Sequence, residues 1–482
     1  MQPVIYSLMP LKKHLHFLLL FSGLVFISAC ASYYQKLEEF NSNIEQGNVE
    51  KAKEFLANDK KGPEGKNKLL YFMNAGTLEM LSGNYAKSNE YFNQADLNIE
   101  DYQKNLGNEA LSLVTNPMQK EYTGEDFEKV LIHYYKALNY VKLGQADEAI
   151  VECKRLNLKI QQLNDKYKKK NRYSEDAFGL NLMGIIYEST GDVNNAFISY
   201  RNAVTAYENT YEPQFKTPIP NQLKKDLIRT AYEMGFDDEG QRFEEKFKMK
   251  NVPRNPNTGE LVFFWNNGLS PVKAENSINF SIVKGQGGYV TFVNQELGLN
   301  IPFPISNNDK STGGLGDLEF VRVAFPKYLE RKPFYSTASI GANNSEYPLE
   351  LAEDINAIAF KTLQDRMLRE MGSSLMRLAT KKAAEYAMRD QNQNVGSLVG
   401  IVNAITEKAD TRNWQTLPNN ISYTRIELPL GNQEIKFKLR SFDNKTINEQ
   451  KFNFVIQKGK TEFQSYQNFE SQSYFGRTAF AR

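Results

Sequence analysis

The sequence predicts an α+β protein in which an all-α solenoid of helical repeats is followed by a mixed β/α domain that contains a long helix. Glycine recurs with the same neighbours through the first half, proline and asparagine break the helical pattern at residues 252–256, and segments rich in β-branched and aromatic residues follow. A chain of 482 residues also exceeds the size at which a single hydrophobic core stops growing. We therefore expect two domains, at residues 30–250 and 251–460.

The N-terminus has the pattern of a secretory signal. Lys12 and Lys13 precede an apolar run over residues 15–27, which is shorter than the about 20 apolar residues that a membrane-spanning helix needs. The run ends in Ile27-Ser28-Ala29-Cys30, which resembles the lipobox of bacterial lipoproteins. The alternative interpretation is an ordinary cleaved signal or a short anchor helix.

In the lipoprotein interpretation, residues 1–29 are the signal peptide and Cys30 is the lipidated first residue of the mature chain. Two or three acyl chains, such as palmitate, would hold the protein stably on a membrane. The residue after the cysteine is Ala31 rather than aspartate, which under the sorting rule for such proteins favours the outer membrane. We therefore expect a lipid-anchored outer-membrane protein that faces the periplasm.

Charge and composition exclude several classes of function. The formal net charge of +2 includes Lys12 and Lys13, and no acidic residue precedes Cys30, so removal of the signal leaves a chain with no net formal charge. Nucleic acid is therefore a poor partner. Cys153 has no cysteine to pair with once Cys30 carries lipid, and in the mature chain it has only His133 as a candidate base. We predict no catalytic residue, no metal site and no cofactor.

The repeats in the first half match the tetratricopeptide pattern, in which each unit is a pair of helices. Small residues let the first helix approach its partner closely, and a glycine turns the chain between the two helices. The clearest unit contains Leu180, Met183, Gly184, Tyr187, Gly191-Asp192, Ala196, Tyr200 and Ala203. Across the units, the predicted positions of close approach are Gly76, Ala137 and Gly184, and the predicted turn glycines are Gly47, Gly83, Gly144, Gly191 and Gly235.

Such a solenoid has a concave face, formed by the first helix of each pair, on which peptides commonly bind. The helical register places a mixture of apolar and polar side chains toward this face: Met73, Thr77, Tyr134, Leu138, Asn181, Ile185 and Glu188. One hypothesis is that these residues bind an extended peptide. The other is that several of them pack against the second domain.

Strands and one long helix are predicted in the second half. The strand segments are residues 260–265, 277–283, 289–293, 318–325, 333–340, 421–428, 434–440 and 452–457. The helical pattern covers residues 349–389, a shorter helix is expected at 395–409, and a poorly ordered tail at 461–482. Gly285-Gln286-Gly287-Gly288 joins two strands of a hairpin and is followed by strand rather than helix, which argues against nucleotide binding.

A motif near the C-terminus carries a family resemblance. Residues 409–418, with the sequence ADTRNWQTLP, and the later Arg425-Ile426-Glu427-Leu428-Pro429 resemble the C-terminal signature of a family of bacterial lipoproteins with tetratricopeptide repeats. The resemblance implies no enzymatic activity and a role in envelope maintenance beside the activators of peptidoglycan synthases. Within the motif we expect a structural role for Arg412, Trp414 and Pro418, with Trp414 stacked beside Arg412 to lock a helix end to the sheet. The alternative is that the tryptophan is an exposed contact.

Together these features predict a membrane-anchored, non-catalytic scaffold whose repeats bind an envelope protein or peptide. The alternative is a glycan-capturing outer-membrane lipoprotein that works with a transporter. Glycan capture requires exposed aromatic platforms, and because Trp265 and Trp414 are the only tryptophans, tyrosines would have to supply them. A hydrolase is a third hypothesis, since sequence distance cannot show whether carboxylates meet in a cleft.

Overall fold

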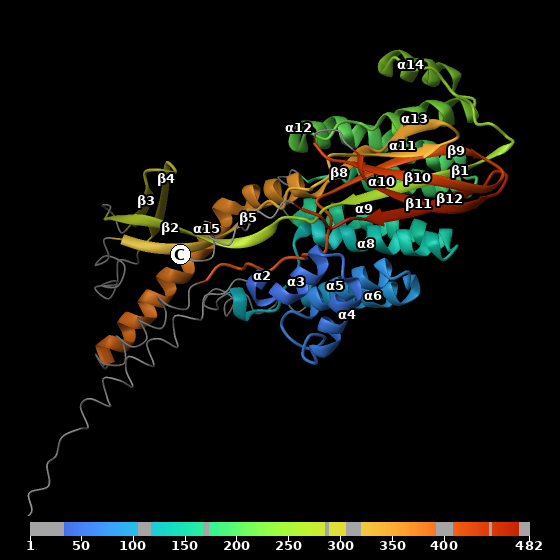
Figure 1. Cartoon of the computed structure of the whole chain (residues 1–482). Coiled ribbons are helices and arrows are strands. Elements are labelled where there is room, and N and C mark those ends of the chain that lie inside the picture. The colour runs from blue at the N-terminus through green and yellow to red at the C-terminus, as the bar shows by residue number, and fades with distance from the viewer. Residues whose placement is uncertain are drawn as a thin grey trace, which may run out of the picture.

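The computed structural model describes residues 33–104, 117–166, 173–284, 289–304, 320–391, 408–442 and 446–471. Helices form the first half of the chain, and strands with one long helix form the second (Figure 1). The protein is therefore α+β and begins with a helical solenoid, as the sequence predicts. The signal segment, Cys30 and most of the helix expected at residues 395–409 lie outside the described residues.

Antiparallel helix pairs build the solenoid. Within the described ranges the pairs are α3 (Glu38–Glu45) with α4 (Val49–Asn58), α5 (Lys68–Leu81) with α6 (Tyr85–Lys104), α8 (Asp126–Lys142) with α9 (Ala146–Lys166), α10 (Ala177–Ser189) with α11 (Val193–Ala206), and α13 (Asn221–Glu233) with α14 (Asp237–Phe247). Shorter segments precede or connect them: α2 (Tyr33–Lys36), η1 (Pro117–Gln119), η2 (Tyr207–Tyr211) and α12 (Glu212–Phe215). Among the helices described, none has the length and apolar content needed to cross a bilayer.

Glycines shape the repeats in two ways, and both were predicted. The turns between paired helices have φ between 72° and 85° at Gly47, Gly83, Gly144, Gly191 and Gly235. This left-handed conformation is one that residues with a Cβ rarely adopt. Inside the helices, a Cβ on Gly76 would lie 2.7 Å from the ring of Phe92, and a Cβ on Gly184 would lie 2.5 Å from the ring of Tyr200. Paired helices can therefore approach closely at these positions only because glycine has no side chain.

Two four-stranded sheets stack on the solenoid. The first has the order β12-β1-β9-β8, with β12 (Thr461–Gln467), β1 (Thr258–Asn267), β9 (Asn420–Pro429) and β8 (Glu350–Asp354). The second has the order β11-β10-β6-β7, with β11 (Thr446–Ile456), β10 (Gly431–Arg440), β6 (Thr337–Ala342) and β7 (Ser345–Pro348). The pair β1 and β12 is parallel, whereas the other pairs in these two sheets are antiparallel.

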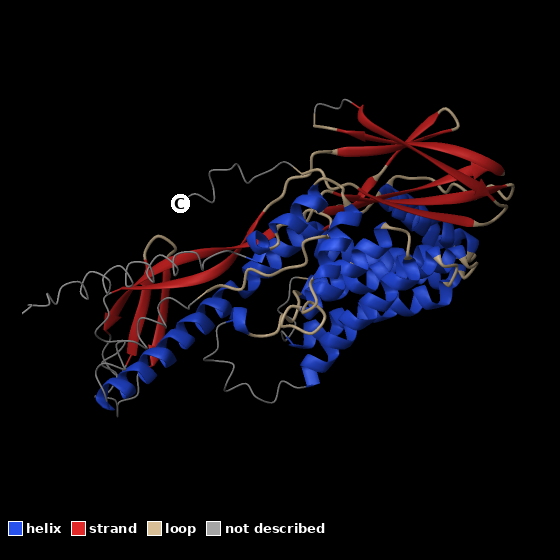
Figure 2. Ribbon diagram, turned by 60° about the horizontal axis from the view of Figure 1, so that its bottom comes forward, coloured by secondary structure: helices blue, strands red, loops and turns tan. Residues whose placement is uncertain are grey.

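The first sheet is the middle of three layers, with the helices on one face and the second sheet on the other (Figure 2). Along β1, Leu261 and Phe263 point into the core between the sheets, whereas Val262 and Phe264 pack with the helices. A strand covered on both faces has a continuous apolar run instead of an alternating one. The run Leu-Val-Phe-Phe-Trp at residues 261–265 fits this position.

A third sheet and the long helix form a projection that we call the arm. Its strands have the order β4-β3-β2-β5, with β4 (Leu299–Pro304), β3 (Tyr289–Asn294), β2 (Val272–Lys284) and β5 (Phe320–Leu329). The helix is α15 (Ile355–Gln391), and it runs along the sheet away from the solenoid (Figures 1 and 2). Phe280, Phe292, Met371 and Leu375 belong to the core between the helix and the sheet.

Three sequence expectations are corrected here. Residues 461–467 are not a disordered tail but strand β12, which pairs with β1 in a register from Glu260↔Thr461 to Asn266↔Gln467. The long helix begins at Ile355, because residues 350–354 form β8. Strands β4 and β7 were not predicted at all. Each of these short strands is stabilised by a neighbour that is distant in sequence or joined by a loop, which a local apolar pattern does not indicate.

Candidate functional site

The concave face of the solenoid, predicted as a peptide groove, is filled by the C-terminal half of the same chain. The predicted side chains are all buried, with exposed fractions of 3% or less: Met73, Thr77, Tyr134, Leu138, Asn181, Ile185 and Glu188. The burial of all seven excludes an open peptide groove at these positions, which corrects that expectation. Tyr134 and Glu188 bond to residues of the second domain, as the second hypothesis states for several of the seven.

An extended segment, residues 408–419, fills the part of the concave face that α5, α6 and α8 form. At its centre Trp414 is 0% exposed, and its ring lies 5.8 Å from the ring of Phe92 and 5.5 Å from that of Tyr135. The backbone N–H of Trp414 donates to Glu128 Oε1 at 2.6 Å, and its indole N–H donates to a threonine hydroxyl of the same segment at 2.8 Å. Both N–H donors of this buried tryptophan, on the backbone and on the indole ring, are therefore hydrogen-bonded.

Arg412 fastens the start of this segment to the solenoid. It is 1% exposed, and its guanidinium donates to the backbone oxygens of Pro117 at 3.0 Å and Lys120 at 2.9 Å. The guanidinium carbon also lies 5.2 Å from the centre of the Tyr122 ring. The predicted stacking of Arg412 on Trp414 is thus corrected: the arginine stacks on Tyr122, and the tryptophan binds the solenoid instead of locking a helix end to the sheet.

Strands β1 and β9 cover the remaining part of the concave face, over α8, α10 and α13. Pro418 is buried two residues before β9 begins. The ring of Phe264 in β1 lies 6.2 Å from the ring of Phe178 in α10, and the hydroxyl of Tyr134 donates to Asn266 Oδ1 at 3.4 Å. The sheet therefore occupies the position in which an extended peptide would bind a tetratricopeptide groove.

A buried ionic network joins the solenoid to the sheet. Glu188 of α10 accepts hydrogen bonds from Arg425 of β9 at 2.5 Å and from Arg229 of α13, and Arg254 of the linker lies 2.8 Å from it. Asp226 of α13 pairs with Arg229 at 2.8 Å and with Arg425 at 3.0 Å. Burial alone would raise the pKa of Glu188, but the three guanidiniums hold it well below its usual range. Glu188 is consequently a charged structural residue and not a ligand-facing one.

A second buried cluster of titratable groups joins α8 to α9. His133 is 1% exposed, and its Nδ1 lies 2.7 Å from Glu152, which also pairs with Lys136 at 2.9 Å. Burial raises the pKa of the Cys153 thiol, so this cysteine stays protonated and unreactive. Across the described ranges, no three His, Cys, Asp or Glu side chains are grouped so as to hold a metal ion.

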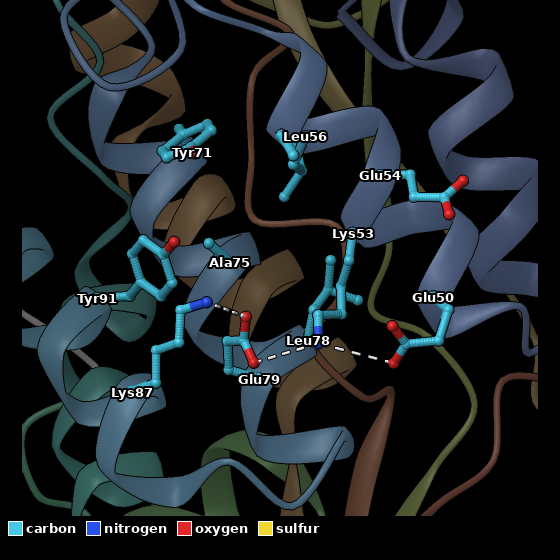
Figure 3. A pocket seen from close by; sticks show the side chains of 11 residues that line it. Glu50, Lys53, Glu54, Leu56, Tyr71, Ala75, Leu78, Glu79, Lys87 and Tyr91 are labelled. Atoms are coloured by element: carbon cyan, nitrogen blue, oxygen red, sulfur yellow. Dashed lines mark ion pairs between the residues drawn. The ribbon is translucent and has the colours of Figure 1, made fainter.

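One surface pocket lies between α4, α5 and α6 (Figure 3). Its volume is about 250 Å³, and Tyr71 and Tyr91 stand on one side of it above an apolar floor that includes Leu78. Lys87 lies beside Tyr91 and pairs with Glu79 at 3.1 Å, and Glu79 also pairs with Lys53 of α4 at 3.2 Å (Figure 3). Partial burial would raise the pKa of Glu79, but its bonds to an asparagine and to the two lysines lower it overall.

The sequence did contain a signal for the filled groove, which the analysis of the repeats alone missed. The apolar run at residues 261–265 indicates a strand buried on both faces, and so requires a second covering layer. The solenoid is one apolar surface predicted by the sequence that could supply this layer. By contrast, no signal in the sequence indicated the partners of Arg425, which lie 237 residues away at Glu188 and 199 residues away at Asp226.

No protein-family model and no curated protein matches the sequence. Among solved structures, MamA matches with 14% identity over 45% of this chain and 96% of its own, at a TM-score of 0.28. A putative kinesin light chain of Podosopora anserina with nearly identical TPR-like repeats matches with 15% identity over 45% of this chain and 93% of its own, at a TM-score of 0.30. BtubC from P. vanneervenii matches with 13% identity over 46% of this chain and 77% of its own, at 0.28. The repeat architecture of this chain is established by its own helix pairs and turn glycines.

Proposed function

We propose that this protein is a lipid-anchored, non-catalytic scaffold of the bacterial cell envelope that binds an envelope protein or peptide. The observation that carries the proposal is how the surfaces of the solenoid are used. The concave face is filled internally by residues 408–419 and by β9, whereas the outer helices of the solenoid are exposed to a partner. Helical repeat solenoids commonly serve as protein-binding surfaces.

The outer helices expose aliphatic side chains that a partner could cover. These are Leu97 of α6, Val151 and Leu158 of α9, and Ile198 of α11, with exposed fractions of 52%, 41%, 53% and 37%. A single exposed aliphatic residue is ordinary on a protein surface. Their recurrence on the second helix of successive repeats favours the convex face of the solenoid as the binding surface.

A pull-down from detergent-solubilised envelopes tests this surface. The Leu97→Ser, Leu158→Ser double variant should recover far less partner than the wild type, because it removes apolar contact area without touching a buried residue. The matched control is Val455→Ser. Val455 is 61% exposed and lies on β11 in the second sheet, away from the solenoid helices. Equal recovery by the double variant and the control would contradict a convex binding surface.

The lipid anchor is supported by the basic residues, the short apolar run and the cysteine at residues 12–30. Mass spectrometry of the native N-terminus should find cleavage before Cys30 and acyl chains on that residue. Density-gradient separation of membranes should place the protein in the outer-membrane fraction, and a Cys30→Ser variant should leave it. An unmodified thiol, or an uncleaved signal, would refute the anchor.

The proposal of a non-catalytic role is supported by the engagement of the buried acids and bases. Glu188, Asp226, Glu152 and His133 are each bonded to other side chains of the interior. The family resemblance of the motif at residues 409–418 adds a role in peptidoglycan synthesis or envelope maintenance. Incubation with purified peptidoglycan should release no soluble muropeptides, and their appearance would favour a hydrolase instead.

Glycan capture remains the second candidate because of the pocket between α4, α5 and α6. Both tryptophans are buried, so they offer no platform to a sugar. Tyr71 and Tyr91 do line a pocket of about 250 Å³ that also carries carboxylates and lysines (Figure 3), and sugars bind by stacking on such rings. Binding on a glycan array that is lost in Tyr91→Ala would promote this candidate over the scaffold.

A further inference from the structure

In the part of the chain that the structure describes, a core cluster lies on one face of the arm's sheet, and the other face carries exposed side chains. Helix α15 packs on the face that contains Phe280. Because side chains alternate along a strand and Ser281 pairs with Phe320, the residues of the other face follow from the register. We call this the outer face of the arm, and its residues are Asn279, Ser281, Val283, Tyr289, Phe320 and Arg322.

The outer face carries exposed apolar side chains next to an arginine. Val283 is 51% exposed, Tyr289 is 50% exposed and Phe320 is 67% exposed. Arg322 is also exposed on this face. Aromatic and aliphatic groups beside Lys and Arg are the residue types that lie at the boundary between lipid headgroups and acyl chains.

The N-terminal end of the described chain lies at the base of this same face. The backbone N–H of Tyr33 donates to Thr411 Oγ1 at 3.0 Å. Two residues away from Thr411, the backbone N–H of Ala409 donates to Glu275 Oε2 at 3.0 Å. Glu275 is four residues before Asn279 on β2, so its side chain belongs to the outer face.

The short distance in sequence between the proposed anchor and Tyr33 limits how the arm can be placed. Tyr33 is three positions after Cys30 in the sequence, a span that reaches at most about 10 Å. Val283 is eight positions after Glu275 along β2, which corresponds to about 26 Å. If only the Val283 end of the arm touched the membrane, the Glu275 end would therefore lie farther from the bilayer than residues 30–33 can reach. The base must lie close to the bilayer, with the outer face on the side from which the tether emerges.

We propose that the outer face of the arm lies flat on the anionic phospholipid surface of the membrane that holds the anchor. This inference rests on the proposed lipidation of Cys30. The lipid chains keep the arm base at the surface, the exposed apolar side chains enter the headgroup region, and Arg322 pairs with a lipid phosphate. The solenoid is thereby held in one fixed orientation above the membrane.

Depth-dependent fluorescence quenching tests this placement. The lipidated protein is reconstituted into vesicles of phosphatidylethanolamine and phosphatidylglycerol, with an NBD label on Val283→Cys. Cys153 is buried and does not compete for the label. Doxyl-labelled lipid should reduce the emission to about half or less, because an interfacial side chain lies about 5–10 Å deep, within reach of the quencher. The matched control is an NBD label on Val455→Cys, in the second sheet at the end away from the arm. The emission of this label should hardly change.

Two further measurements make each failure distinct. Adding Phe320→Ser to the labelled Val283→Cys protein should weaken the quenching, because it removes the largest apolar side chain of the outer face. Quenching at position 283 that is no stronger than at position 455 would overturn the proposal. Energy transfer between labelled copies in place of quenching would also overturn it, and would indicate that another copy covers the outer face. Mass spectrometry of the same sample reports whether Cys30 carries lipid, so failure of the anchor is recognised separately from failure of the arm.

Discussion

The Glu188→Gln substitution distinguishes a structural concave face from a ligand-binding one. The side chain of Glu188 is 0% exposed and lies between the guanidiniums of Arg229, Arg254 and Arg425. Removing its charge leaves three guanidiniums whose remaining carboxylate partners are Asp226, Glu233 and Glu260. Loss of one partner from a buried ion pair costs about 3–5 kcal/mol, a large part of the about 5–15 kcal/mol that stabilises a typical domain. A residue that served only to bind a ligand would show no such cost.

Urea unfolding at pH 7 measures this loss, followed by the fluorescence of Trp265 and Trp414, both of which are buried in the native protein. The matched control is Glu208→Gln, which breaks an exposed pair with Lys246 at 2.7 Å and should cost no more than about 1 kcal/mol. An unfolding free energy of Glu188→Gln within about 1 kcal/mol of the wild type would refute the reasoning.

A double-mutant cycle with Arg425→Met then isolates the contact between solenoid and sheet. Arg425→Met alone leaves Glu188 and Asp226 with fewer cations, and should be strongly destabilising. In the Glu188→Gln background the same change should cost less, with a coupling energy of about 0.5–3 kcal/mol, because the two residues share one network. Strict additivity of the two substitutions would show that they act independently.

Three further predictions concern packing, pH and reactivity. Gly184→Ala should lower the unfolding free energy by about 1–3 kcal/mol because its Cβ would meet the ring of Tyr200, whereas Gly372→Ala, whose Cβ meets nothing within 4 Å, should raise it by up to about 1 kcal/mol. Burial raises the pKa of Glu353 well above its usual value, so Glu353→Gln should raise the melting temperature at pH 8 and leave it unchanged below pH 4. In a Cys30→Ser variant, Cys153 should react with a maleimide only after unfolding, as mass spectrometry of the product would show.

The sign of the pH effect follows from linkage. A carboxyl whose native pKa is raised contributes stability below its ordinary pKa of 4.5 and loses that contribution as the pH rises through the native value. The wild type should therefore fall behind Glu353→Gln toward high pH. The control is Glu296→Gln, an exposed residue of the turn between β3 and β4, which should show no pH-dependent difference from the wild type. A constant difference for Glu353→Gln across the pH range would contradict the assigned pKa shift.

The local features of the fold were predictable because each depends on neighbours along the chain. The turns between paired helices require a left-handed φ, which glycine adopts readily, and the helix positions next to an aromatic ring of the paired helix have no room for a Cβ. Both requirements place glycines at a recognisable spacing in the sequence. The strands β1, β2 and β9 were predicted within a few residues, since β-branched and aromatic residues fill them. The strands that were missed are β4, β7, β8 and β12, and of these β8 and β12 pair with strands that are distant in the sequence.

The sequence by itself determined that this protein has helical repeats, where their turns fall, and which side chains share the concave face. Only the tertiary structure decided what covers that face. An extended peptide and a strand of the same chain present the same backbone groups to a concave apolar surface that carries an amide and a carboxylate. The seven predicted residues are therefore compatible with either. The choice was made by Trp414, Arg412 and Arg425, which lie more than 230 residues from Phe92, Pro117 and Glu188. Such contacts depend on closing long loops around a complete core, and no spacing within a helix or strand records them.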